Sequence, residues 1–250
     1  MRKTLLLALV SFSFLVAPSS ARAQGAASDS WKITVAPYVF GSGMTGTTAI
    51  AGQELDVDMS FGDILSNLQF GAMGLVVARK GNWGIGGDAI WMSLGANATA
   101  PGPVGVTGSV DFNEGAFSFY GLRRLNPIAD LTFGGRIDTL QGTLRINGLN
   151  QRTIDGSKTW FDPVVGVMLH TPAGGSRWHA QVLAEIGGFG VGSTFTWQLF
   201  PTVGVDLSKR SSLEFGYRLL DIDYSSGEGL TLFKYDVLAH GPVVGFAFKF

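Results

Sequence analysis

Apolar and polar side chains alternate, one residue at a time, through much of this chain. One run has apolar residues at Trp178, Ala180, Val182, Ala184 and Ile186. The positions between them hold His, Gln, Leu and Glu, and the same pattern recurs over residues 195–203 and 213–219. Because successive side chains of a β-strand point to opposite faces, this period of two predicts strands with one apolar and one polar face.

Short and long breaks separate these runs in turn. The short breaks carry turn-forming residues and lie at 80–82, 126–128, 171–175 and 208–211. The long breaks are more polar and lie near 42–66, 96–111, 147–158 and 225–231. This order is typical of an antiparallel up-and-down transmembrane β-barrel with short periplasmic turns and long extracellular loops.

The expected fold is therefore all-β, with about ten strands and with eight or twelve as alternatives. The strands are predicted to begin near residues 31, 68, 83, 112, 130, 158, 177, 194, 212 and 232. An even number of strands places both termini in the periplasm.

The N-terminal residues predict export. Arg2 and Lys3 precede an apolar run over residues 5–17, and the small residues Ala21 and Ala23 mark a cleavage site. This is the pattern of a secretory signal peptide. The apolar run is shorter than the roughly 20 residues of a membrane-spanning helix, so a retained anchor is the weaker alternative.

Cleavage would remove residues 1–23 and leave residues 24–250 as one barrel domain, since no linker divides them. Without the three basic residues of the leader, 15 basic residues face 19 acidic ones, a net charge of −4. That balance argues against nucleic acid as a partner. The chain has no cysteine, which excludes disulfides and thiolate metal sites.

The last residues form a row of aromatic side chains. Phe246, Phe248 and Phe250 share one strand face, opposite Ala247 and Lys249. Chain ends usually fray in water, whereas such a row suits the lipid-facing side of a strand. The ending resembles the C-terminal signal of Gram-negative outer-membrane proteins, which implies that the barrel-assembly machinery reads it.

The six tryptophans fall into two predicted levels. Trp31, Trp83 and Trp178 follow short turns or the N-terminal segment, while Trp91, Trp160 and Trp197 lie near long loops. Aromatic belts at both interfaces are typical of membrane barrels. A soluble β-sandwich with core tryptophans is the alternative.

Across nearly the whole predicted mature chain, the arrangement resembles the small outer-membrane barrels of the OmpA and OmpW type. The resemblance implies a location in the outer membrane, with lipid and lipopolysaccharide as partners. We expect no periplasmic domain after the barrel, so the resemblance does not imply peptidoglycan binding. These barrels differ widely in activity, and the resemblance indicates no function beyond fold and location.

The polar parity of the strands is predicted to face the barrel interior. These inward positions are Asp88, Arg136, Asp138, Asp162, His179, Gln181, Glu185, Gln198, Asp206, Glu214 and Arg218. A barrel this narrow holds side chains and little water, so charges of both signs are expected to pair. They predict a structural barrel, or a narrow porin-like passive pore, with a charged and largely filled lumen.

The predicted lumen cluster consists of Glu214, Arg218, His240, Arg136, Asp138 and Glu185. His240 belongs to it only if a bulge at Gly241 and Pro242 switches the parity of the last strand and brings His240 opposite Gly216.

An enzyme acting on lipid or peptide at the cell surface is the alternative function. Barrel enzymes of these kinds pair a histidine with serine or aspartate. Here His170, His179 and His240 have no serine within two residues, and no catalytic triad can be assembled. We expect no catalytic residue, cofactor or metal.

One short helix is predicted inside the first long loop. Phe61, Ile64, Leu65 and Leu68 follow helical spacing, and Ser60 with the aspartate three residues later resembles a capping box. The helix is expected to brace neighbouring loops or to fold into the barrel mouth.

Overall fold

The computed structural model describes residues 30–50, 53–99, 107–147, 152–172, 174 and 176–250. The predicted signal peptide lies outside these residues. The elements are β1 (Lys32–Phe40), β2 (Gly43–Ile50), β3 (Gln53–Met59), α1 (Phe61–Asn67), β4 (Leu68–Lys80), β5 (Trp83–Thr99), β6 (Thr107–Asn126), β7 (Ala129–Asn147), β8 (Arg152–His170), β9 (Trp178–Gly187), β10 (Phe195–Ser208), β11 (Ser211–Ser226), the 3-10 helix η1 (Gly229–Thr231) and β12 (Phe233–Lys249). No helix among the described residues is long and apolar enough to cross a membrane.

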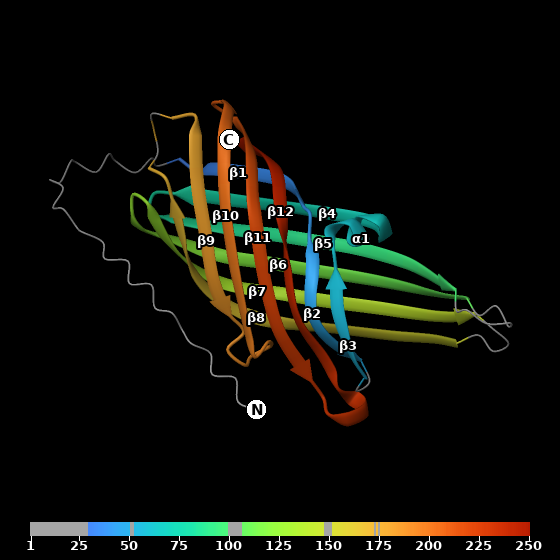
Figure 1. The fold of residues 1–250 in the computed structure, drawn as a ribbon. Coiled ribbons are helices and arrows are strands. Elements are labelled where there is room, and N and C mark those ends of the chain that lie inside the picture. Colours follow the sequence, from blue (N-terminus) through green and yellow to red (C-terminus); the bar gives the residue numbers. More distant parts are fainter. Residues whose placement is uncertain (1–29, 51–52, 100–106, 148–151, 173, 175) are drawn as a thin grey trace, which may run out of the picture.

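Ten of the strands form a closed antiparallel barrel, as the sequence predicts. β4 to β12 pair in chain order, and β1 closes the wall by pairing with both β4 and β12. β4 to β8 form one side, and β9 to β12 cross them steeply on the other (Figure 1). The fold is all-β and up-and-down. Eight of the ten strands begin within one residue of the predicted positions, while β6 and β8 begin five and six residues earlier than predicted.

One end of the barrel carries the short connections, and we call it the short-turn end. The turns at 81–82, 127–128 and 209–210 lie there. The start of β1 and the end of β12 meet at the same end, where Ile33 and Phe250 exchange two backbone hydrogen bonds of 3.2 and 2.8 Å. The opposite end is the long-loop end.

The predicted first long loop, 42–66, contains more structure than expected. β2 pairs with β12 from His240–Gly43 to Lys234–Ala49, and β3 completes a hairpin on β2. β1 and β2 therefore act as one long strand with a bend between them, and β2–β3 is an addition to the ten-strand wall. The segments near 96–111 and 147–158 likewise hold strand residues, because β5 to β8 continue pairing past the level where their neighbours end.

The wall is incomplete on the long-loop side, at two seams. Pairing between β1 and β4 ends at Pro37–Gly74, although β4 extends six residues further toward the long-loop end, to its first residue Leu68. Pairing between β8 and β9 ends at Val164–Gly187, although β8 extends further toward the long-loop end, to its first residue Arg152. Other groups must close the barrel at both seams.

The predicted helix is present beside the first seam. In α1, the Ser60 hydroxyl accepts a hydrogen bond from the Asp63 amide, and the Asp63 carboxylate accepts one from the Ser60 amide. Hydrogen bonds donated by the Ser60 hydroxyl and amide lower the pKa of the Asp63 carboxyl below its ordinary value. Ile64 is buried against the barrel interior, so the helix braces the wall as well as the loops.

Apolar side chains cover the outer face of the wall. Exposed outward residues include Ile85, Phe119, Phe133, Val165, Ile186, Val203, Phe215 and Val244. Trp31, Trp83 and Trp178 are more than half exposed near the short-turn end, which agrees with the first predicted tryptophan level. Trp160 was wrongly assigned to the second level: it is 6% exposed and stacks on Tyr224 with ring centroids 4.1 Å apart.

An apolar cluster fills the long-loop half of the interior. Its buried members include Phe40, Met44, Ile64, Ile90, Met92, Leu94, Leu140, Trp160, Leu220, Ile222, Tyr235 and Val237. They come from both sides of the barrel and from α1. The cluster separates the polar part of the interior from the long-loop end.

Candidate functional site

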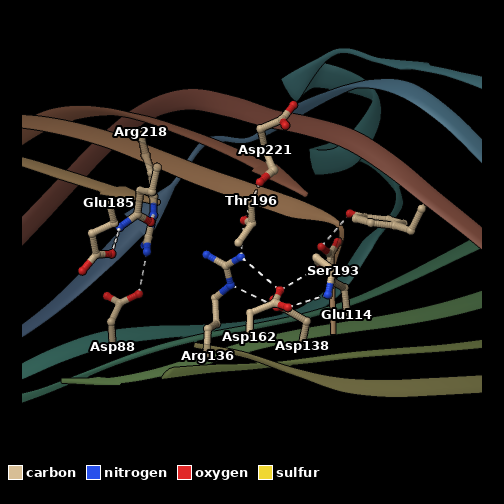
Figure 2. A network of polar contacts seen from close by, with 12 residues as sticks. Asp88, Glu114, Arg136, Asp138, Asp162, Glu185, Ser193, Thr196, Arg218 and Asp221 are labelled. Atoms are coloured by element: carbon tan, nitrogen blue, oxygen red, sulfur yellow. Dashed lines mark hydrogen bonds and ion pairs between the residues drawn. The ribbon is translucent and has the colours of Figure 1, made fainter. Parts of the chain in front are cut away.

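The polar side chains gather inside the barrel, from its short-turn half up to the apolar cluster, where Asp138 of β7 lies opposite Trp160 of β8. Those that are almost fully buried are Asp88, Asp130, Thr132, Arg136, Asp138, Asp162, Glu185, Ser193, Thr196, Gln198, Ser212 and Arg218. Figure 2 shows two separate networks of polar contacts, one around Arg218 and one around Arg136. The inward parity predicted from the sequence is thus the parity that the strands adopt at these positions.

Arg218 of β11 reaches across the barrel to β1 and β5. Its Nη2 donates to Asp88 Oδ1 at 2.8 Å, and its Nη1 donates to the Tyr38 hydroxyl at 2.8 Å. The Tyr38 hydroxyl in turn donates to Asp88 Oδ2 at 2.8 Å. Nε donates to Gln198 Oε1 at 2.7 Å, and the guanidinium carbon lies 5.3 Å from the Phe200 ring centroid. All three guanidinium nitrogens are therefore engaged.

Glu185 of β9 lies beside this network without joining its ion pair. Its carboxylate accepts hydrogen bonds from the Thr132 hydroxyl at 3.2 Å and from Gln198 Nε2 at 3.1 Å. Both donors are neutral. Glu185 is only 8% exposed, so its charge has little compensation from water.

The second group surrounds Arg136 of β7. Arg136 Nε donates to Asp138 Oδ2 at 3.0 Å, and Nη2 lies 3.7 Å from Asp162 Oδ2. The guanidinium also donates to the Thr196 hydroxyl. Asp162 accepts hydrogen bonds from the amide and the hydroxyl of Ser193 at 2.6 and 2.7 Å. These contacts tie the β9–β10 loop to β8 at the second seam.

A third polar group lies at the short-turn end. His179 Nε2 is 2.9 Å from Glu214 Oε1, and the Ser212 hydroxyl donates to the same oxygen at 2.6 Å. Asp206 forms an ion pair with Lys249. Ser212 donates to the glutamate and not to the histidine, so this group lacks the serine–histidine contact that activates a nucleophile.

The structure separates the residues of the predicted lumen cluster. Arg136 and Asp138 are in contact, while Arg218 pairs with Asp88 and Glu214 with His179. Glu185 is inward but bonds to Thr132 and Gln198.

The position predicted for His240 was wrong. β11–β12 pairing continues without a break through Tyr217–Pro242 and Arg218–Gly241, so no bulge switches the parity of β12. His240 lies opposite Leu219 and not Gly216. It faces outward, where its Nδ1 and the Tyr217 hydroxyl share a hydrogen bond of 2.9 Å.

Sequence reasoning missed several interior residues. Tyr38 of β1 lies inside the barrel, on the same strand face as the buried Ala36, and Arg218 donates to its hydroxyl, but the inward residues predicted from the sequence did not include it. Glu114 is buried in the long-loop half, where its Oε1 accepts from the Tyr235 hydroxyl at 2.9 Å. Its parity on β6 was available as a signal, since Phe117 and Phe119 mark the outward face.

A cavity of about 270 Å³ occupies the short-turn half of the interior. Leu75, Val77, Tyr120, Leu183 and Phe200 supply much of its apolar wall. The charged side chains that line it are Arg79, Asp88, Glu185, Glu214, Arg218 and Lys249. Among the described residues, no group of three or more His, Asp or Glu is placed to hold a metal ion.

Similarity to known proteins is detected at the level of solved structures. No protein-family model matches it, and no curated protein matches it. Among solved structures, Ail, the attachment invasion locus protein of Yersinia pestis, is 12% identical with a TM-score of 0.37 and covers 89% of this chain and 100% of its own. The translocator domain of autotransporter NalP from Neisseria meningitidis is 11% identical with a TM-score of 0.40 and covers 88% and 89%. The toluene transporter TodX of Pseudomonas putida is 10% identical with a TM-score of 0.34 and covers 89% and 90%. At these values no property of the three proteins is transferred to this chain.

Proposed function

We propose that this chain is an outer-membrane barrel whose role is structural and whose interior does not conduct. The membrane location is supported by the apolar side chains exposed around the outer wall. Residues such as Ile85 and Val203 are 62% and 46% exposed on strands that belong to opposite sides of the barrel. Soluble proteins rarely expose apolar surface so widely, whereas a lipid-facing belt requires it.

The observation that carries the structural role is the filled interior. Arg218 spans the barrel to Asp88 and Tyr38 at mid-height. The apolar cluster then fills the long-loop half, with Trp160 and Tyr235 among its buried members. A continuous aqueous path would have to cross both obstacles.

Export by a cleaved signal peptide belongs to the same proposal. So does delivery by the barrel-assembly machinery through the ending at Phe246, Phe248 and Phe250. Lipid and lipopolysaccharide would then be the permanent partners of the outer wall.

The membrane location can be tested with brominated lipids, which quench tryptophan at bilayer depth. Trp83 and Trp178 are exposed on the outer wall, so the emission of the refolded protein should fall strongly in brominated vesicles. Unquenched emission, together with solubility in plain buffer, would favour a soluble barrel.

Single-channel recording tests the closed interior. The purified barrel in planar bilayers should show no discrete conductance steps. Reproducible steps would overturn the structural role and favour the alternative of a narrow passive pore. Hydrolysis of lipid or peptide by the purified barrel would favour the enzyme alternative.

A further inference from the structure

The outer face of the wall carries no negative charge in the short-turn half of the described chain. The carboxylates nearest the short-turn end, Asp130, Asp206 and Glu214, all lie on the inward parity of their strands, where each contacts a cation or a histidine. No outward position of the described strands and turns in this half holds aspartate or glutamate. Lys80 and Arg123, by contrast, do hold outward positions there.

The outer face of the long-loop half has the opposite charge. Asp223 of β11 lies opposite Asp236 of β12, and Asp221 shares the same outward face. The acidic residues of β3 occupy its outward parity as well. Among the described residues, Lys234 is the cation that pairs with this group, at 3.4 Å from Asp236. An anionic group outside the barrel is therefore attracted to the short-turn end and repelled from the long-loop end.

Arg123 of β6 is held on an aromatic ring of the outer wall. It lies opposite Trp83 of β5, and its guanidinium carbon is 4.6 Å from the centroid of the Trp83 ring. This contact uses the face of the guanidinium, whereas its five N–H donors lie in the guanidinium plane. No described residue accepts a hydrogen bond from these donors. Because Trp83 is 55% exposed, the stacked pair offers its donors to whatever surrounds the barrel.

The stacked pair lies where the outer wall changes from polar to apolar. Lys80, Trp83 and Arg123 form one outward row across β4, β5 and β6. The next outward row is about 7 Å further along the strands. That row contains Ile85 and Phe133, which are 62% and 43% exposed. A phospholipid places its phosphate at such a boundary, with its acyl chains on the apolar side.

We propose that Arg123, held on Trp83, binds the phosphate of an anionic phospholipid, and that phosphatidylglycerol has the matching headgroup. Two N–H groups of the guanidinium would bond to two phosphate oxygens. The acyl chains would lie along Ile85 and Phe133, which buries apolar surface. A zwitterionic headgroup is a poorer match, because its ammonium group meets no carboxylate on this part of the described outer face. The inference rests on the proposed membrane location and adds to it a lipid class and a binding residue.

A fluorophore placed beside the site tests this proposal. The chain has no cysteine, so Asn82→Cys gives a single attachment point next to Trp83. The labelled barrel is refolded in phosphatidylcholine vesicles, and quenching by small amounts of spin-labelled phosphatidylglycerol and phosphatidylcholine is compared. We expect phosphatidylglycerol to quench equally at about a fivefold lower mole fraction, which is the effect of one cation beside an anionic lipid surface.

Variants in the labelled background separate the site from the general charge of this end. Arg123→Gln should make the two spin-labelled lipids quench equally, and Trp83→Leu, which removes the ring under the guanidinium, should reduce the preference. Lys209→Gln is the matched control, because it removes one positive charge from the exposed turn between β10 and β11 at the same end. It should keep the preference of the parent. A preference that persists in folded Arg123→Gln would overturn the proposal, because the net charge of this end would then be its source.

Quenching by spin-labelled phosphatidylcholine tests the membrane location separately. Equal quenching of the labelled parent by both lipids would overturn the phospholipid site and would still support the membrane location. The absence of quenching by either lipid would overturn both. The folding of each variant is checked by the difference in gel mobility between unboiled and boiled samples.

Discussion

Asp162 holds Ser193 by two hydrogen bonds, from the amide and from the hydroxyl, at 2.6 and 2.7 Å. Both residues are fully buried. Strand pairing between β8 and β9 ends just before this point, at Val164–Gly187. One carboxylate therefore continues the closure of the wall where the backbone ladder stops, and it also neutralises Arg136.

Removing this carboxylate should weaken the barrel strongly. Asp162→Ala leaves the Arg136 charge short of one partner and the Ser193 amide without an acceptor, so we expect a loss of about 3 kcal/mol in unfolding free energy. Ser193→Ala removes only the hydroxyl bond and should cost about 1 kcal/mol. Urea unfolding in lipid vesicles measures both, and equal losses would contradict the role given to the carboxylate.

The Arg218–Asp88 pair is expected to stabilise the barrel without controlling conductance. Arg218→Met buries an uncompensated Asp88 and should cost about 3 kcal/mol, while adding Asp88→Asn should recover part of that loss. Conductance should stay at baseline in both variants, because the apolar cluster is untouched. A large leak in Arg218→Met alone would show that Arg218 itself closes the interior.

The alternation of residues along each strand correctly predicted which side chains face the barrel interior wherever strand pairing is regular. Asp88, Arg136, Asp162 and Arg218 all face inward as expected, since alternation in a strand is fixed by backbone geometry. The same rule also places Trp160 inside, because Trp160 shares the parity of Asp162. Its assignment to the outer tryptophan level rested on its proximity to a loop instead, and that signal was misleading.

Pairing across the barrel could not be read from the sequence. Arg218 was expected near Glu214, two rungs along its own strand, but its partner Asp88 is on β5. Which side chains meet across a lumen depends on strand tilt and register, and a slip of one residue reverses every side chain. The β2–β3 hairpin was missed although apolar and acidic residues alternate over 54–59, because the whole of 42–66 was interpreted as one long polar loop.

Acid should loosen α1 before the barrel unfolds. The pKa of Asp63 is lowered by its bonds to Ser60, so this contribution is present above the ordinary aspartate pKa and is lost as the pH falls through the lowered value. Hydrogen exchange of the α1 amides should therefore speed up at low pH in the parent. Ser60→Ala should exchange faster at neutral pH and show a shallower pH dependence, and an unchanged profile would contradict the capping contribution.

Phe250 is expected to matter for assembly more than for stability. It is 75% exposed, and only its backbone is tied down, to Ile33. Deleting Phe250 should lower the amount of protein in the outer membrane far more than Lys249→Gln, which removes the inward ion pair with Asp206. Similar amounts of the two variants in membrane fractions would remove the assembly signal from Phe250.

The bend between β1 and β2 should tolerate no side chain at Gly241. A Cβ there would lie 2.0 Å from the Gly41 carbonyl oxygen and 2.8 Å from its carbon, and backbone atoms in a paired ladder cannot swing aside. Gly241→Ala should force β12 away from the bend and cost about 2 kcal/mol or more in unfolding free energy. Gly142→Ala on β7 is the control, because a Cβ there meets nothing within 4 Å, and we expect a change within about 0.5 kcal/mol. If Gly241→Ala unfolds at the same urea concentration as Gly142→Ala, the two strands do not approach each other as closely as the structure places them.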